Sequence, residues 1–149
     1  MRIALLTTAI TSLLVAGCSS QPSAAPEHPL TPASAPIATT RQIMLAVVIP
    51  ASDIVWSTAT GAPADDAAWE KIQANAVMLA EAGHLLLTRA VDQGEWSIQT
   101  KALIDSATAA AQAAADKNLD KLNEAGNNMY DACDRCHQKY MPARQGEAK

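Results

Sequence analysis

Apolar side chains recur at alternating spacings of three and four residues along most of the chain after residue 40. That spacing is typical of amphipathic helices, and no long stretch shows the period of two expected of a strand. The pattern therefore predicts four helices and an all-α fold. They run from about 40 to 60, from 65 to 90, from 97 to 115 and from 118 to 141.

The residues between these stretches predict how the helices begin and end. Pro50 interrupts the first helix and is expected to kink it, because proline lacks the amide hydrogen and crowds the preceding turn. Gly61 and Pro63 end that helix, and Ser97 is expected to cap the third. Connections of a few residues place consecutive helices antiparallel, so we expect an up-down-up-down four-helix bundle.

The start of the chain reads as an export signal. Met1 and Arg2 precede an apolar run that is too short to span a membrane. The run ends in Leu14-Val15-Ala16-Gly17-Cys18, which resembles the box of bacterial lipoproteins. That resemblance implies a signal peptide over residues 1–17, lipidation of Cys18 and a lipid anchor that does not span the membrane. Ordinary signal cleavage that leaves Cys18 as a free thiol is the alternative.

The remaining chain divides into three parts. Residues 18–39 are rich in Pro, Ala and Ser and predict a disordered tether, which at about 3.1 Å per residue could reach some 60 Å. Residues 40–142 form the helical domain, and 143–149 a disordered tail. The domain has no Phe and much Ala. Such a core either packs its helices closely or encloses a large group that is not protein.

The chemistry is concentrated in the last predicted helix, in the sequence MYDACDRCHQKYMP (129–142). Cys133, Cys136 and His137 are spaced i, i+3 and i+4, so they share one face that continues the apolar stripe. A thioredoxin-like redox pair would place its cysteines at the start of a helix in a βαβ unit. A structural zinc site would need four ligands, for which His84, His28 and Cys18 are the other candidates.

The third interpretation is covalent attachment of haem c, for which C-x-x-C-H is the signature. Two thiols one helical turn apart can form thioethers with the two vinyl groups of a porphyrin. The adjacent imidazole then coordinates the iron as the proximal ligand. An export signal agrees with this interpretation, because such attachment happens outside the cytoplasm. A haem would also be the large apolar group that an Ala-rich core encloses.

At this point the chain resembles a known family, the cytochrome c-prime-like four-helix-bundle cytochromes. The resemblance covers about residues 40–140 and rests on NEAGNNMYDACDRCHQKY near the end and RQIMLAVVIPASDIVW in the first helix. It implies that Cys133 and Cys136 attach one haem c and that His137 is an axial iron ligand. In this family the first helix faces the distal side of the haem, where Met44 would be the second axial ligand of a low-spin iron.

Other residues are weaker candidates for that second position. Met129 is expected to pack beneath the porphyrin, Met141 to lie on the proximal side and Met78 to fill the core. Met44 itself could also merely fill the core. His84 is expected on a helix flank rather than at the iron. Arg41 either lines the distal pocket or is a solvated charge.

The sequence therefore predicts a periplasm-facing one-electron carrier that is tethered to a membrane, with the outer membrane favoured because Ser19 follows Cys18. A five-coordinate haem module that binds NO or CO and a non-haem structural lipoprotein are the alternatives. The net charge of −4 becomes −5 without Arg2, which favours transient encounter with basic redox partner proteins. No basic stripe suggests nucleic acid. No constellation of catalytic side chains suggests an enzyme, and a homodimer is left open.

Overall fold

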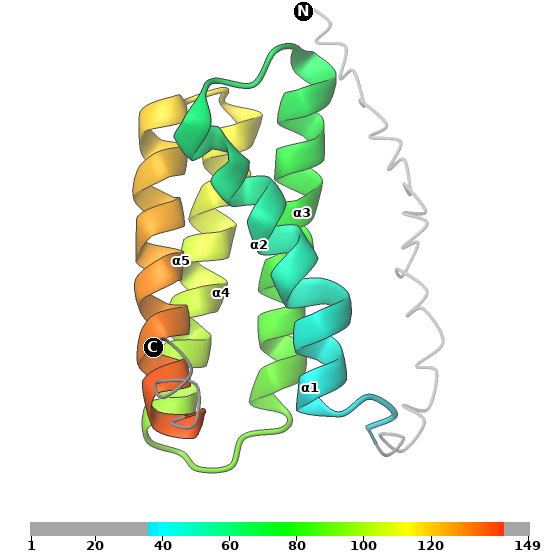
Figure 1. Ribbon diagram of the computed structural model, residues 1–149, viewed down its shortest axis with the longest axis vertical. Coiled ribbons are helices and arrows are strands. Elements are labelled where there is room, and N and C mark those ends of the chain that lie inside the picture. The colour runs from blue at the N-terminus through cyan, green and yellow to red at the C-terminus, as the bar shows by residue number, and fades with distance from the viewer. Residues whose placement is uncertain (1–35, 142–149) are drawn as a thin grey trace, which may run out of the picture. The chain divides into compact units, whose positions relative to one another are not determined.

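The computed structural model describes residues 36–141, and within that range the fold is all-helical with no strand (Figure 1). The first helical segment consists of four consecutive pieces: α1 (Thr40–Ile43), the π-helical turn η1 (Met44–Val48), α2 (Ile49–Trp56) and the 3₁₀ turn η2 (Ser57–Thr60). Three longer helices follow, α3 (Asp66–Leu87), α4 (Glu95–Ala115) and α5 (Leu119–Tyr140). The all-α prediction is confirmed. The predicted signal peptide, Cys18, most of the tether and the tail lie outside the described residues.

The four helical segments run alternately up and down in chain order (Figure 1). Helix α4 packs along both α3 and α5, which makes it the centre of a three-helix layer. The first segment crosses this layer obliquely: α1 and η1 lie on α3, whereas α2 and η2 also contact α5. As a result, the start of the first segment and the last turns of α5 lie at the same end of the bundle (Figure 1).

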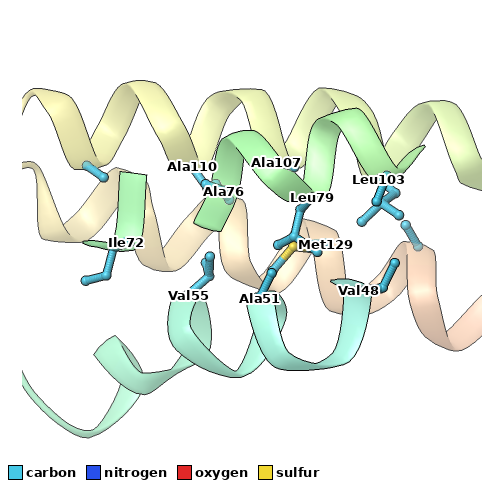
Figure 2. Close-up of a cluster of buried hydrophobic side chains, with 14 of the residues drawn as sticks. Val48, Ala51, Val55, Ile72, Ala76, Leu79, Leu103, Ala107, Ala110 and Met129 are labelled. Carbon is cyan, nitrogen blue, oxygen red and sulfur yellow. The ribbon is translucent and has the colours of Figure 1, made fainter. Parts of the chain in front are cut away.

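Small side chains hold the helices close together. Ala76, Ala107 and Ala110 are fully buried where α3 and α4 meet, and the close-up of Figure 2 shows them beside the larger Leu79. Met129 of α5 is also fully buried, and its sulfur lies among the core side chains in the same view. Of the two packing alternatives that the composition left open, close helix packing is the one seen in this region.

Most of the predicted stripes are found buried. On α3 the buried members are Ile72, Ala76, Leu79, Gly83 and Leu86, and on α5 they are Leu122, Gly126 and Met129. Met78 departs from the prediction, because half of its side chain is exposed (50 %). It is one residue before Leu79, which turns it about 100° away from the core-facing row of α3.

Glycines mark the closest approaches between helices. A Cβ atom at Gly83 would lie 2.4 Å from Cγ1 of Ile104, whereas one at Gly126 would meet Trp56 Cδ1 at 3.4 Å, an ordinary contact. We therefore expect Gly83→Ala to lower the free energy of unfolding by about 1 kcal/mol, overpacking outweighing the gain in helix propensity. Gly126→Ala should be neutral or raise it by up to about 1 kcal/mol. Urea denaturation of both variants checks this, and equal destabilisation of the two would contradict the packing.

Side-chain caps fix where the helices begin. Asp65 accepts a hydrogen bond from the Ala68 amide at 2.8 Å, and Asn118 accepts one from the Lys121 amide at 3.0 Å, both at predicted starts. The prediction for Ser97 is wrong, because α4 begins two residues earlier, at Glu95. The Asp92 side chain, which precedes the helix, instead accepts hydrogen bonds from the amide of Gly94 and from that of Trp96 in the first turn.

The first helical segment is the most apolar part of the described chain. By length and composition alone, residues Thr40–Thr60 could cross a membrane, with a mean hydropathy of 1.6. Its inner row nevertheless packs against the other helices, with Ile43, Val48 and Val55 buried in the core. Leu45 and Ile49 lie on the outer face, each about half exposed.

Candidate functional site: the C-x-x-C-H turns of α5

The C-x-x-C-H sequence forms the last turns of α5. Cys133 is half-buried and packs against the core cluster, Cys136 is half-buried, and His137 is exposed. The two thiols thus continue the apolar stripe, as the spacing predicted, whereas the imidazole lies at its outer edge. No hydrogen bond of the His137 ring is found within residues 36–141, although its carbonyl accepts one from the Met141 amide at 2.8 Å. As far as the described residues go, both ring nitrogens are available to a ligand.

Both thiols are held in their protonated form. Burial, aided by the nearby Cys136, raises the pKa of Cys133 to about 11. The pKa of Cys136 is also raised, first by burial and then by the negative charges of Glu95 and Asp92. A thioredoxin-like pair depends on the opposite shift, which a helix N-terminus provides. Here the cysteines occupy the C-terminal end of a helix, whose dipole also disfavours a thiolate, so the redox-pair interpretation is disfavoured.

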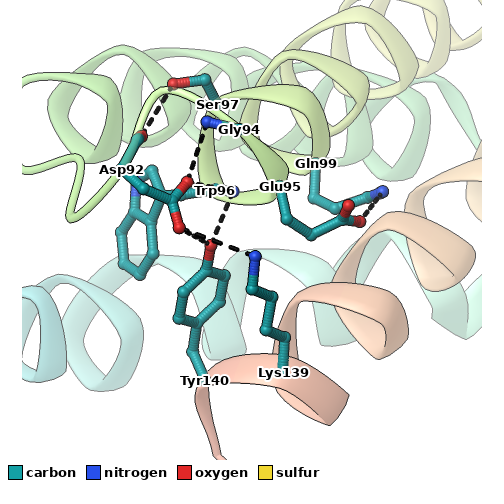
Figure 3. Close-up of polar contacts among 8 residues, drawn as sticks. All are labelled: Asp92, Gly94, Glu95, Trp96, Ser97, Gln99, Lys139 and Tyr140. Atoms are coloured by element: carbon teal, nitrogen blue, oxygen red, sulfur yellow. Dashed lines mark hydrogen bonds and ion pairs between the residues drawn. The ribbon is translucent and has the colours of Figure 1, made fainter.

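A polar clamp fixes the end of α5 to the start of α4 (Figure 3). The Tyr140 hydroxyl donates to Asp92 and accepts a hydrogen bond from the Trp96 amide at 2.9 Å. Asp92 accepts further bonds from the Gly94 and Trp96 amides, at 3.0 and 3.2 Å, and Lys139 lies 3.7 Å from its carboxylate. We call these side chains the Asp92–Tyr140 clamp. Because Tyr140 lies one turn beyond His137, the clamp holds the turn that carries the imidazole.

The contribution of the clamp to the free energy of unfolding depends on pH. The pKa of Asp92 is lowered, chiefly by the hydrogen bond from Tyr140, so its contribution is present above the ordinary carboxyl pKa of about 4 and is lost as the pH falls through the lowered value. The pKa of Tyr140 is raised, first by burial and then by Asp92, so its contribution is present below about pH 10 and is lost above its raised value.

Tyr140→Phe should therefore unfold at a lower urea concentration than the wild type at pH 7. The difference between their urea midpoints should become smaller below pH 4 and above pH 10. Urea midpoints across that range measure it. Tyr130→Phe is the matched control, because Tyr130 is exposed (58 %) on the same helix. A difference that is constant from pH 3 to 11 would show that the hydroxyl contributes only through packing.

The donor set suits haem better than a single metal ion. Among residues 36–141, no group of three His, Cys, Asp or Glu side chains is placed to hold one ion. For haem attachment the three side chains need not meet at one point, because each sulfur would bond to a different vinyl carbon and only the imidazole would bind the iron. The half-buried neutral thiols of Cys133 and Cys136 and the available imidazole of His137 fit that requirement.

Met44 follows α1 directly, and α1 lies at the same end of the bundle as the last turns of α5 (Figure 1). Met44 is half-buried at the margin of the core cluster against which Cys133 also packs, and it opens the π-helical turn η1. Met141 also lies at this end, because its amide bonds to the carbonyl of His137. Met129 is fully buried, whereas Met141, the residue after α5, is 36 % exposed.

The remaining candidates are at the surface. Arg41 and His84 are both exposed, and the position of His84 on the flank of α3 is as predicted. Two grooves are found on the described surface, and neither cysteine is among their lining residues. One follows η2 and the start of α3. The other lies between α4 and α5, where Ser106, Ala132 and Arg135 line it, so it reaches the turns that carry the cysteines.

Two features of the site were not found by sequence reasoning. The first is the Asp92–Tyr140 clamp, whose partners are 48 positions apart. The second is the π-helical turn at Met44–Val48. The kink expected at Pro50 was the only signal for it.

In comparisons with known proteins, no family model, no curated protein and no solved structure matches this chain. The resemblance to the cytochrome c-prime family therefore rests on the residues of the first and last helices alone.

Proposed function

We propose that this chain is a c-type cytochrome of the c-prime-like four-helix-bundle kind, which carries one electron on a single covalently bound haem c. Cys133 and Cys136 would hold the porphyrin, His137 would be the proximal iron ligand and Met44 the distal one. The observation that carries the proposal is the C-x-x-C-H sequence in the closing turns of a bundle helix, with neutral half-buried thiols and an available imidazole.

Each side chain has a distinct task in this proposal. Cys133 and Cys136 would each form a thioether, in which the sulfur bonds to one vinyl carbon and the thiol hydrogen goes to the other. When bound, the haem supplies the Fe(III)/Fe(II) couple. A thioether ligand from Met44 favours the ferrous state and raises the reduction potential. The Asp92–Tyr140 clamp keeps the His137 turn in place, which limits reorganisation during electron transfer.

The cellular setting follows from the start of the chain and from its charge. We propose export to the periplasm, lipidation at Cys18 and attachment to a membrane, with the outer membrane favoured. The tether would let the domain reach partners away from its anchor. With a net charge of −4 for the whole sequence, the protein suits brief encounters with basic redox proteins, which should weaken as salt is added.

Optical spectra of protein matured with a haem c attachment system test the proposed function. We expect sharp low-spin ferrous bands, a reversible one-electron titration and little change on addition of CO or NO, because Met44 occupies the distal position. A high-spin spectrum that shifts at once with either gas would favour the gas-binding module instead. Colourless protein from the same system would leave only a helical lipoprotein.

A further inference from the structure

The π-helical turn η1 changes which residues of the first segment face the core. In a regular α-helix, residues five apart point about 140° away from each other. One extra residue in the turn brings them to within about 40°. Ile43 and Val48 are five apart, yet both are buried, with exposures of 3 % and 5 %. Their common burial is the signature of the extra residue.

Met44 takes a different direction because of this turn. In a regular helix it would point within about 40° of Val48, and Ile43 would point to the outer face. With the π turn, Ile43 takes the core position, and Met44 is turned by about 100° to the other side of Val48. Met44 is accordingly half-buried at the core margin, whereas Leu45 beside it is 50 % exposed.

Pro50 gives a physical reason for the π turn at this place. It has no amide hydrogen, and in a regular helix its ring would collide with the carbonyl four residues earlier, that of Ala46. The wider turn relieves that collision. The Ile49 amide, the last one before the proline, bonds to the carbonyl of Met44, five residues back, rather than to that of Leu45.

We propose that Pro50 and the π turn before it are the device that presents Met44 as the distal ligand. This inference rests on the proposed function and extends it: Pro50 is a positioning residue that acts through the direction of Met44. A return to the regular helix would swing the Met44 side chain by about 100°. At a radius of roughly 5 Å, that is about 8 Å, too far to keep a bond to iron.

Two variants separate the direction of Met44 from the presence of the turn. Pro50→Ala restores an amide that can bond to Ala46 and should convert the segment to a regular helix with Met44 misdirected. Deletion of Ala46 combined with Pro50→Ala also gives a regular helix, but the missing residue returns Ile43 and Met44 to their original directions. Both variants remove a helix breaker and so should fold, which far-UV circular dichroism verifies.

The readouts are the spin state of the matured ferric and ferrous protein and its reduction potential. We expect Pro50→Ala to lose the low-spin Met-ligated spectrum and to fall in potential, and the deletion variant to keep both. Low-spin ligation that survives in Pro50→Ala, or that is lost in the deletion variant, would overturn the inference.

The same set of proteins distinguishes this failure from failure of the proposed function. Wild type without haem would remove the proposed function and this inference together. If the haem-containing wild type and Met44→Ala gave the same spectrum, the assignment of Met44 as a ligand would be wrong. A Met44-dependent spectrum that Pro50→Ala leaves unchanged, or that the deletion variant loses, would contradict the role of Pro50 and leave the proposed function standing.

Discussion

Alanine at both Cys133 and Cys136 is expected to yield a folded bundle with no covalently bound haem. The two thioethers are the only bonds by which this site would retain a porphyrin under denaturing conditions, so their loss should be complete. Haem-stained denaturing gels and the intact mass of the matured protein measure it. Because Cys133 only borders the core, the helical circular dichroism signal should change little.

Arg135→Ala is the matched control for this experiment. Arg135 lies between the two cysteines and is exposed, so its replacement leaves the C-x-x-C-H spacing intact. Haem retained in the double cysteine variant, at the level of Arg135→Ala, would place attachment elsewhere in the chain.

Replacement of Met44 by alanine is expected to convert the matured protein from low-spin to high-spin haem. Its reduction potential should fall by on the order of 0.1 V, because the thioether ligand that favours Fe(II) is removed. The open position should then take up CO or NO readily. Magnetic circular dichroism and a spectroelectrochemical titration measure the two effects.

Met78→Ala is the control for the loss of a methionine. Its side chain is half exposed on α3, on the outer side of the bundle core. The low-spin spectrum should therefore persist in this variant. If Met44→Ala and Met78→Ala behaved alike, Met44 would be a core-margin residue without a role at the iron.

The helices could be predicted because their signals are local. The alternation of three and four along α3 and α5 records directly which side chains face the core, and the ends of the first segment and of α4 fall at Thr60 and Ala115, as expected. The start of α4 was misplaced for a physical reason. Ser97 has the chemistry of a cap, but the carboxylate of Asp92 accepts a hydrogen bond from the Trp96 amide in the first turn, from outside the helix.

The site was predictable in part. The spacing of Cys133, Cys136 and His137 is enough to predict that they share one face of a helix. The degree to which each is buried depends on tertiary packing, which spacing does not record, and so the exposed position of His137 was missed. The Asp92–Tyr140 hydrogen bond links α5 to a loop far away in sequence.

The direction of Met44 shows how one residue can alter a pattern. In a regular helix, Ile43 would share a row with Val47, and Met44 would share one with Val48. The π turn instead pairs Ile43 with Val48. A proline predicts disturbance in the preceding turn, but it does not specify whether the helix bends or gains a residue.

Trypsin offers the most direct test of whether haem is attached to this chain. Cleavage after Lys121, Arg135 and Lys139 separates the two cysteines into the peptides 122–135 and 136–139. In matured protein, we predict that both peptides elute together as one haem-containing species whose mass is the sum of the two peptides and one haem, iron included. Two separate peptides, each with a cysteine that reacts with a thiol reagent, would contradict the account.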